Sequence, residues 1–169
     1  MSTGATEKNP VGLRGIEFVE FTSMDPAYVD GIFKDLGLSR LMKHRGKNLY
    51  YYRQNDIHFL LNHADTGFER AFSEKHGNSI CAMGWRVHDA QFAFEEALCR
   101  GARAFEPGRE GASDFDLPCI YGIGDSLIYF VDDYGNRDWM AKQGFDPLDS
   151  PDLVEDKGFF VVDHLTNNV

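Results

Sequence analysis

Apolar positions near the start of the chain follow first the spacing of a strand and then that of a helix. In residues 15–21 (GIEFVEF) apolar side chains are interspersed with glutamates, which predicts a buried β-strand. A helix should begin at Pro26, because Asp25 is a suitable N-cap and proline is favoured in the first turn, and Gly37 should end it. The predicted apolar face of this helix consists of Tyr28, Val29, Ile32, Phe33 and Leu36.

Three more strands are predicted before residue 62. The first covers 41–45, and the clearest is the aromatic run 49–53 (LYYYR). A third strand, 57–61 (IHFLL), follows after Asn55 and Asp56, a pair that favours a tight hairpin turn. The first part of the chain is therefore predicted to contain one strand, one helix and three strands.

The same order of elements returns in the second half of the chain. A strand is predicted over 80–87, and a helix capped by Asp89 and ended by Gly101 follows it. Three short strands come next, at 104–105, 118–123 and 126–131, with a turn at Gly124 and Asp125 between the last two. We predict an α+β fold built from two repeated βαβββ modules, residues 10–75 and 76–140, in one domain, 10–140.

The two ends of the chain and the stretch 141–157 do not fit this repeat. Residues 1–9 are polar and are expected to form a flexible tail. The stretch 141–157 is rich in acidic residues, glycine and proline, which predicts a linker. Residues 158–169 (GFFVVDHLTNNV) become strand-like again, so they are predicted to begin a third unit as the first strand of a further domain.

Composition and charge exclude several classes of partner. Of 169 residues, 43% are hydrophobic, which is enough to fill a core. The formal net charge of -10 repels nucleic acids and anionic membrane surfaces, and no stretch approaches the ~20 apolar residues of a membrane span. Three cysteines without C-x-x-C spacing are expected to be buried free thiols of a cytoplasmic protein: Cys81, Cys99 and Cys119.

Candidate chemistry in the sequence is sparse. The segment Gly122 to Gly124 lies between two predicted strands and is interpreted as a turn, not as a phosphate loop. No serine or cysteine nucleophile motif is present. Five of the six histidines are expected to face solvent or to be hydrogen-bonded individually. His164 differs, because it continues an apolar row on the predicted last strand, which leaves a core histidine and a metal ligand as alternatives.

Four stretches resemble bacterial 4-hydroxyphenylpyruvate dioxygenases, and they are spread over nearly the whole chain. They are 9–20 (NPVGLRGIEFVE), 74–87 (EKHGNSICAMGWRV), 117–124 (LPCIYGIG) and 162–169 (VDHLTNNV). The last is the most specific, because its histidine, His164, corresponds to the first iron ligand of that family. The resemblance implies the vicinal oxygen chelate fold, also found in glyoxalase and dihydroxybiphenyl dioxygenase, with paired modules, a mixed curved sheet and helices outside.

The resemblance also implies a function for the complete family member, which is about twice as long as this chain. That enzyme uses Fe(II) and O2 to convert 4-hydroxyphenylpyruvate into homogentisate in tyrosine catabolism, and it is a cytoplasmic homo-oligomer. The resemblance implies that the chain is its non-catalytic amino-terminal part, with His164 as the one metal ligand and no catalytic or cofactor-binding residue. At the positions that would correspond to His164 in the first two modules, Glu17 and Ala82 are expected.

Two alternatives and one structural expectation stay open. The chain could be a stand-alone binding or scaffold module that cups a small aromatic ligand, or part of a related 2-oxo acid dioxygenase such as 4-hydroxymandelate synthase. If its sheet neighbours are missing, the segment 159–169 is expected to be frayed or docked against another copy.

Overall fold

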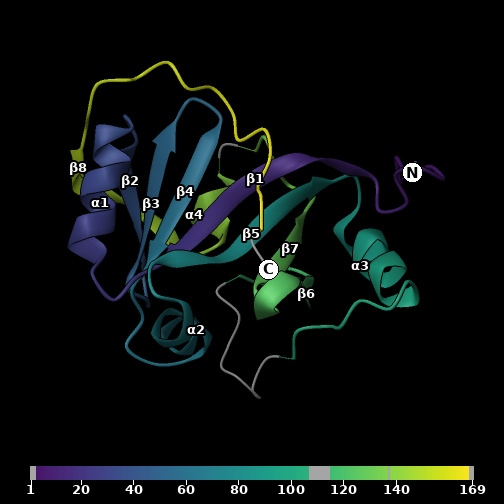
Figure 1. Ribbon diagram of the computed structural model, residues 1–169. Helices are drawn as coiled ribbons and strands as arrows, with labels where there is room; N and C mark the ends of the chain where they lie inside the picture. Colours follow the sequence, from purple (N-terminus) through teal and green to yellow (C-terminus); the bar gives the residue numbers. More distant parts are fainter. Residues whose placement is uncertain (1–2, 107–114, 137, 168–169) are drawn as a thin grey trace.

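A single mixed sheet organises the computed structural model, which describes residues 3–106, 115–136 and 138–167 (Figure 1). The eight strands of this sheet lie in the order β6-β7-β5-β1-β4-β3-β2-β8. Their bounds are β1 Leu13–Thr22, β2 Ser39–His44, β3 Leu49–Gln54, β4 Ile57–Asn62, β5 Ser79–Val87, β6 Cys119–Tyr121, β7 Leu127–Val131 and β8 Phe145–Asp152. The helices are α1 Pro26–Asp35, α2 Phe68–His76, α3 Ala90–Cys99 and α4 Trp139–Lys142, with a short 3-10 turn at Ile123–Asp125.

The two halves of the sheet have the same topology. In the first half β1 pairs with β4 in parallel, and β3 is antiparallel to both of its neighbours, β4 and β2. In the second half β5 pairs with β7 in parallel, and β6 is antiparallel to β7. The central strands β1 and β5 join the halves in an antiparallel pair. The predicted repeat and the mixed sheet are confirmed, although the strand expected at 104–105 is reduced to one bridge between Ala104 and Ile120.

Helices α1 and α3 cover the outer, convex face of the sheet, one over each half (Figure 1). Val29 and Phe33 of α1 pack on Tyr52 and Leu61 of the first half. Side chains from α2 and α4 instead join the core on the concave face. The sheet curls strongly, since aromatic side chains from its central strand and from its edge strand β8 belong to this one core.

Both predicted N-caps are present, but the predicted apolar face of α1 is partly wrong. The Asp25 side chain accepts a hydrogen bond from the Tyr28 backbone N–H, and the Asp89 side chain caps α3 in the same way. Only Val29 and Phe33 of the five expected residues are buried. The other three are at least 39% exposed, because the sheet contacts a narrower stripe of the helix than the pattern allows: Tyr28, Ile32 and Leu36.

The predicted linker 141–157 contains regular structure. Helix α4 ends inside it, and β8 follows and pairs with β2 at the edge of the sheet. The strand was missed because an edge strand that faces solvent needs few apolar residues and tolerates proline, here Pro147 and Pro151. Helix α2, for which no element was predicted, begins at Phe68, and its N-cap Gly67 provides no side-chain cap.

The expected last strand is not formed in the described part of 158–169. The start of this segment instead contacts the turn between β3 and β4. The backbone N–H of Asp56 donates to the Phe160 carbonyl, 3.0 Å away, and the Asn55 side chain donates to the Phe159 carbonyl, 2.8 Å away. Residues 159–160 are therefore held by hydrogen bonds to the β3–β4 turn, contrary to the expectation that they fray. Docking on a second copy stays a prediction. Residues 168–169 of this prediction lie outside the described residues.

The remaining predictions concern the tail, the cysteines and the membrane. The described part of the tail is held at Asn9, whose side chain exchanges two hydrogen bonds with the backbone of Leu13. Cys81 and Cys119 are buried thiols as expected, but Cys99 is exposed on α3. Among the residues that the structure describes, no helix is long and apolar enough to cross a membrane.

Candidate functional site

The concave face of the sheet is filled by an aromatic core. The ring of Phe18, on the central strand β1, lies 5.0 Å from that of Phe115 and 6.0 Å from that of Trp139. Phe115 in turn lies 6.4 Å from Phe145 on the edge strand. None of these four side chains is more than 4% exposed. Rings from the centre and the edge of the sheet therefore meet in the space where a curved sheet could otherwise hold a ligand.

One charged network, centred on Arg86, borders this core. Glu17 lies in a bulge of β1, since the neighbouring register pairs Ile16 with Trp85 and Phe18 with Gly84 and leaves Glu17 unpaired. The bulge directs the Glu17 carboxylate to the concave side, where it accepts a hydrogen bond from Arg86 Nε and is only 2% exposed. Arg86 is thereby held by the strand pair that joins the two halves of the sheet.

The β3–β4 hairpin supplies the other members of the network. Asp56 at its turn accepts two hydrogen bonds from Arg86, at 2.7 Å from Nη1 and 2.9 Å from Nη2. His58 Nε2 lies 3.5 Å from Asp56 Oδ1, and its Nδ1 lies 2.7 Å from Tyr51 Oη. The Tyr134 ring lies 5.7 Å from the Arg86 guanidinium. Glu17, Asp56 and Tyr134 thus contact the guanidinium directly. His58 and Tyr51 are linked to it through Asp56.

Burial and pairing shift the protonation equilibria of this network in opposite directions. Burial raises the pKa of Glu17, although hydrogen bonds from Arg86 and Trp139 oppose that rise. Burial lowers the pKa of His58 to about 4, and Asp56 only partly offsets this. The Arg86 hydrogen bonds lower the pKa of Asp56, and burial raises that of Tyr51. His58 is therefore neutral at neutral pH, with Tyr51 donating to Nδ1 and the Nε2 proton directed toward Asp56.

A cavity of about 310 Å³ opens beside the network. Leu41, Met42 and Met140 form its apolar wall, and the network residues and Arg53 form its polar wall. The cavity presents both apolar and polar surface but no unpaired charge from this network, because the carboxylates of Glu17 and Asp56 are bound by the guanidinium and the His58 imidazole is uncharged.

The described residues do not make an iron site. A non-heme iron of the expected type requires two histidines and a carboxylate around one point. No group of three or more His, Cys, Asp or Glu side chains that could hold a metal ion occurs in the described parts of the chain. Glu17 and Ala82 are the residues expected to correspond to His164 in the first two modules. Glu17 faces the Arg86 cation, and Ala82, 1% exposed, packs in the concave core.

His164, the candidate metal ligand, lies away from this network. Its side chain is 77% exposed, and its Nδ1 lies 2.9 Å from the carboxylate of the adjacent Asp163. His164 therefore offers one accessible imidazole beside a carboxylate, and the structure brings no second histidine to it among the described residues.

The other histidines agree with the expectation of individual contacts. His58 binds Tyr51, His44 accepts a hydrogen bond from the Gly46 backbone, and His63 stacks on Tyr50 at 6.1 Å. What the sequence did not reveal is that His58 belongs to the Arg86 network. Glu17 and Arg86 each interrupt an apolar strand run, and that interruption was the one available signal.

A family model and several curated relatives show to which family the chain is similar. A family model described as "Hydroxyphenylpyruvate dioxygenase, HPPD, N-terminal" matches residues 7–146. The protein MelA of Shewanella colwelliana is 50% identical over 165 residues, which are 98% of this chain and 47% of MelA. The 4-hydroxyphenylpyruvate dioxygenase of Pseudomonas aeruginosa is 36% identical over 167 residues, which cover 96% of this chain and 46% of that enzyme. The chain thus spans about half the length of these relatives.

A solved structure shows the same fold. It is a xylose isomerase-like TIM barrel/4-hydroxyphenylpyruvate dioxygenase fusion protein, which aligns with a TM-score of 0.72 and 30% identity over 84% of this chain and 22% of its own. Together with the paired-module topology of the sheet, this likeness shows a vicinal oxygen chelate fold.

Proposed function

Because the chain belongs to the hydroxyphenylpyruvate dioxygenase family and corresponds to its N-terminal domain, we propose that it is the non-catalytic part of an Fe(II)-dependent dioxygenase. The complete enzyme would convert 4-hydroxyphenylpyruvate and O2 into homogentisate in the catabolism of tyrosine. In this proposal residues 10–140 form a scaffold domain, 141–157 connect it to the catalytic domain, and 158–169 begin that domain.

The filled concave face is the observation that carries the scaffold role. The aromatic core around Phe18 and Phe115 occupies the inner side of the sheet, and Arg86 neutralises the carboxylates that border it. A metal centre would need that space and those donors. In the complete enzyme the iron would instead be held by His164 together with a second histidine and a glutamate from that enzyme's second half, and it would supply the activation of O2 there.

Oxygen uptake with Fe(II) and 4-hydroxyphenylpyruvate tests this proposal. The chain alone is expected to show no turnover, whereas a chimera that continues into the second half of the Pseudomonas aeruginosa relative should turn over and retain iron. In that chimera His164→Ala should abolish turnover and iron retention, and His76→Ala, at the end of α2, serves as the matched control. Turnover by the chain alone, or full iron retention after His164→Ala, would contradict the proposal.

The cavity beside Arg86 favours a second candidate function, that of a binding module without chemistry. Its volume of about 310 Å³ and its wall of apolar and polar side chains suit a small aromatic ligand. Calorimetric titration of the chain with 4-hydroxyphenylpyruvate in the presence of a metal chelator separates the two candidates. Saturable binding that Arg86→Met removes would support the binding module, and the absence of heat would leave the scaffold role as the function of the domain.

A further inference from the structure

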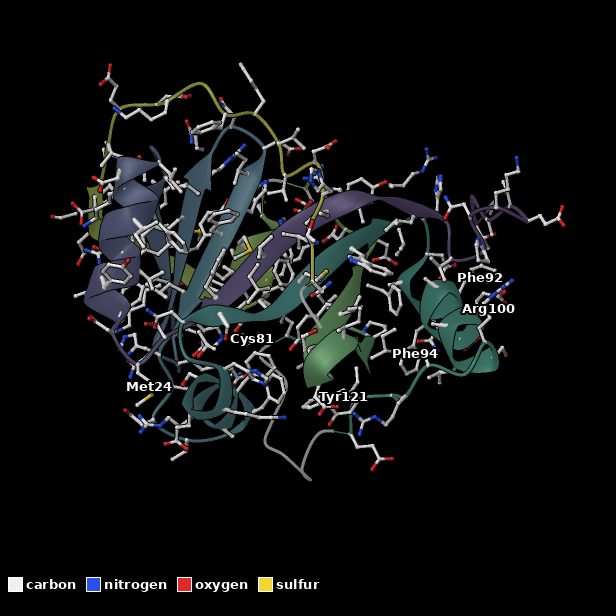
Figure 2. All side chains as sticks on the ribbon, in the orientation of Figure 1. Met24, Cys81, Phe92, Phe94, Arg100 and Tyr121 are labelled. Carbon is white, nitrogen blue, oxygen red and sulfur yellow. The ribbon has the colours of Figure 1, made fainter. Side chains whose placement is uncertain are left out.

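Residues 153–161, which lead from β8 toward His164, cross the end of the sheet on the outside of the molecule. Figure 1 shows this yellow segment passing over the end of α1 and over the turn between β3 and β4. Many of its side chains extend into open space (Figure 2), and Phe159, Phe160 and Val161 are 51, 70 and 54% exposed. Burial of apolar side chains therefore contributes little to the path of this segment, and its backbone is held in another way.

Gln54, the last residue of β3, holds the middle of the segment. Its side chain is buried, with 4% exposed, and accepts a hydrogen bond from the Lys157 backbone N–H at 2.7 Å. The same amide group donates to the carbonyl of Leu36, at the end of α1, at 2.8 Å. A Cβ added at Gly37 would lie 2.9 Å from the Lys157 backbone nitrogen. The helix end, the strand end and the segment therefore meet at one buried amide, whose oxygen and nitrogen are both bonded.

Asn55, in the turn, holds the next part of the segment. Its backbone φ of 51° is in the left-handed region, which glycine and asparagine favour. Its side chain donates to the Phe159 carbonyl, 2.8 Å away, and to the Asp156 carboxylate, 3.0 Å away. In the corresponding turn of the second module, Gly124 lies in the left-handed region. A glycine at position 55 would allow the same turn but would form neither bond, so the asparagine side chain serves the segment and not the turn.

The turn is itself fixed to both modules. Asp56 donates its backbone N–H to the Phe160 carbonyl at 3.0 Å, and its carboxylate accepts two hydrogen bonds from Arg86 of β5 at 2.7 and 2.9 Å. Further along the chain, Val162 packs against the apolar cluster under α1. His164 follows two residues later, and two extended residues span at most about 7 Å. The fixed segment therefore confines the backbone of His164 to a small region.

We propose that Gln54 and Asn55 are positioning residues for His164, because they fix the path of the chain that carries this imidazole. The inference rests on the proposed function, in which His164 is a metal ligand of the complete enzyme. A ligand on a freely moving connection would lose conformational entropy when a metal binds. The two side chains order residues 157–160 beforehand, so less of that entropy remains to be lost.

The chain itself tests whether these side chains order His164. Spin labels on the exposed Cys99 of α3 and on His164→Cys give a distribution of distances by double electron–electron resonance. Cys81, which Figure 2 places in the sheet, is buried, as is Cys119, so neither should react with the label. The labelled parent is expected to give one narrow distribution.

Gln54→Met/Asn55→Gly should broaden that distribution. Methionine keeps the length of the glutamine side chain, and glycine keeps the left-handed turn, so the double variant removes mainly the hydrogen bonds to the segment. Gln91→Met, which replaces an exposed amide on α3, is the control and should leave the distribution unchanged. Circular dichroism and urea midpoints verify folding. An unchanged distribution in the double variant would overturn the proposal, and so would a broad distribution in the parent.

The chimera with the second half of the Pseudomonas aeruginosa relative tests the consequence for metal binding. Under conditions where every variant is fully folded, Gln54→Met/Asn55→Gly should raise the dissociation constant for Fe(II) at least about tenfold, and Gln91→Met should not change it. Asn55→Asp should also weaken the binding, because it replaces a donor by a carboxylate that faces Asp156. Asn55→Asp/Asp156→Asn exchanges donor and acceptor and should recover part of the affinity. Absence of that recovery would contradict a positioning role.

The proposed function and the positioning role fail in different ways. Full iron retention after His164→Ala would overturn the proposed function and this inference with it. Loss of iron after His164→Ala, together with an unchanged dissociation constant after Gln54→Met/Asn55→Gly, would overturn only the positioning role.

Discussion

Arg86 is the single residue on which the charged network of the concave face depends. Its guanidinium neutralises Glu17, which is 2% exposed, and it binds Asp56, whose side chain is 52% exposed. Removal of the Arg86 cation would affect these two carboxylates differently, because their access to water differs. Asp56 can be solvated by water, but Glu17 would remain as a charge in a buried position.

Arg86→Met is therefore expected to lower the free energy of unfolding by about 3 kcal/mol or more at pH 7. Urea denaturation measures this loss. The double variant Glu17→Gln/Arg86→Met should recover part of it, because an amide replaces the unpaired carboxylate, and Asp56→Asn/Arg86→Met should recover less. Equal recovery in both double variants would show that the burial of Glu17 is not the cause.

His58 gives the same network a pH dependence. Its pKa in the folded state is lowered to about 4 from an ordinary 6.5, so folding disfavours the proton. The stability that the neutral imidazole provides is complete above pH 6.5 and is lost as the pH falls toward 4. Glu17 has a raised pKa and acts in the opposite direction. The stability that its protonated form provides is complete below pH 4.5 and is lost as the pH rises above that value. Comparison with a variant that lacks only His58 isolates the histidine contribution.

His58→Gln keeps a hydrogen-bond partner for Tyr51 and removes the titration. The stability difference between the wild-type chain and this variant should be constant above pH 7 and should shrink by about 3 kcal/mol between pH 6.5 and 4. Urea denaturation across this range measures the difference, and His76→Gln, in an exposed position on α2, is the control. A difference that does not change with pH would contradict the burial of a neutral His58.

At the scale of elements, the sequence predicts those that bury a regular apolar pattern and misses those that do not. Strands β1, β3, β4 and β5 were predicted within one or two residues of their ends, because buried strands need apolar side chains at set intervals. Strand β8 buries mainly Phe145 and is otherwise polar, so its sequence resembles a linker. Helix α2 spans two turns and has only Phe68 and Phe72 as apolar anchors, too few for a periodic signal.

The candidate site was less predictable than the fold, because its residues meet through tertiary register. That Glu17 and Arg86 interrupt apolar runs is visible in the sequence, but their contact depends on a bulge in β1 and on the β1–β5 pairing. Asp56 was predicted correctly as a turn residue, and its bond to Arg86 could not be inferred from that role. Local patterns specify elements, and the chemistry of this face arises where elements from both modules meet.

At the scale of the whole molecule, the β1–β5 pair joins the two modules into one sheet. Gly84 on β5 lies opposite Phe18 on β1, and the Phe18 ring covers the space where a side chain would stand. A Cβ at Gly84 would meet that ring well inside van der Waals contact. The ring cannot move aside, because Phe115, Tyr129 and Trp139 surround it. The central strand pair is therefore the join between the modules, and it has no room for an added side chain at Gly84.

Gly84→Ala is expected to lower the free energy of unfolding by about 1–3 kcal/mol, because it overpacks this join, and to do so for both modules at once. Tryptophan fluorescence, which reports Trp85 and Trp139, and far-ultraviolet circular dichroism, which reports all elements, should give coincident urea transitions in the wild-type chain and in the variant. Gly46→Ala, where a Cβ would meet only the His44 ring at 4.0 Å, an ordinary van der Waals distance, should change stability little. Separate transitions for fluorescence and circular dichroism would mean that the modules unfold independently. In that case Gly84→Ala would destabilise mainly the second module, which contains β5.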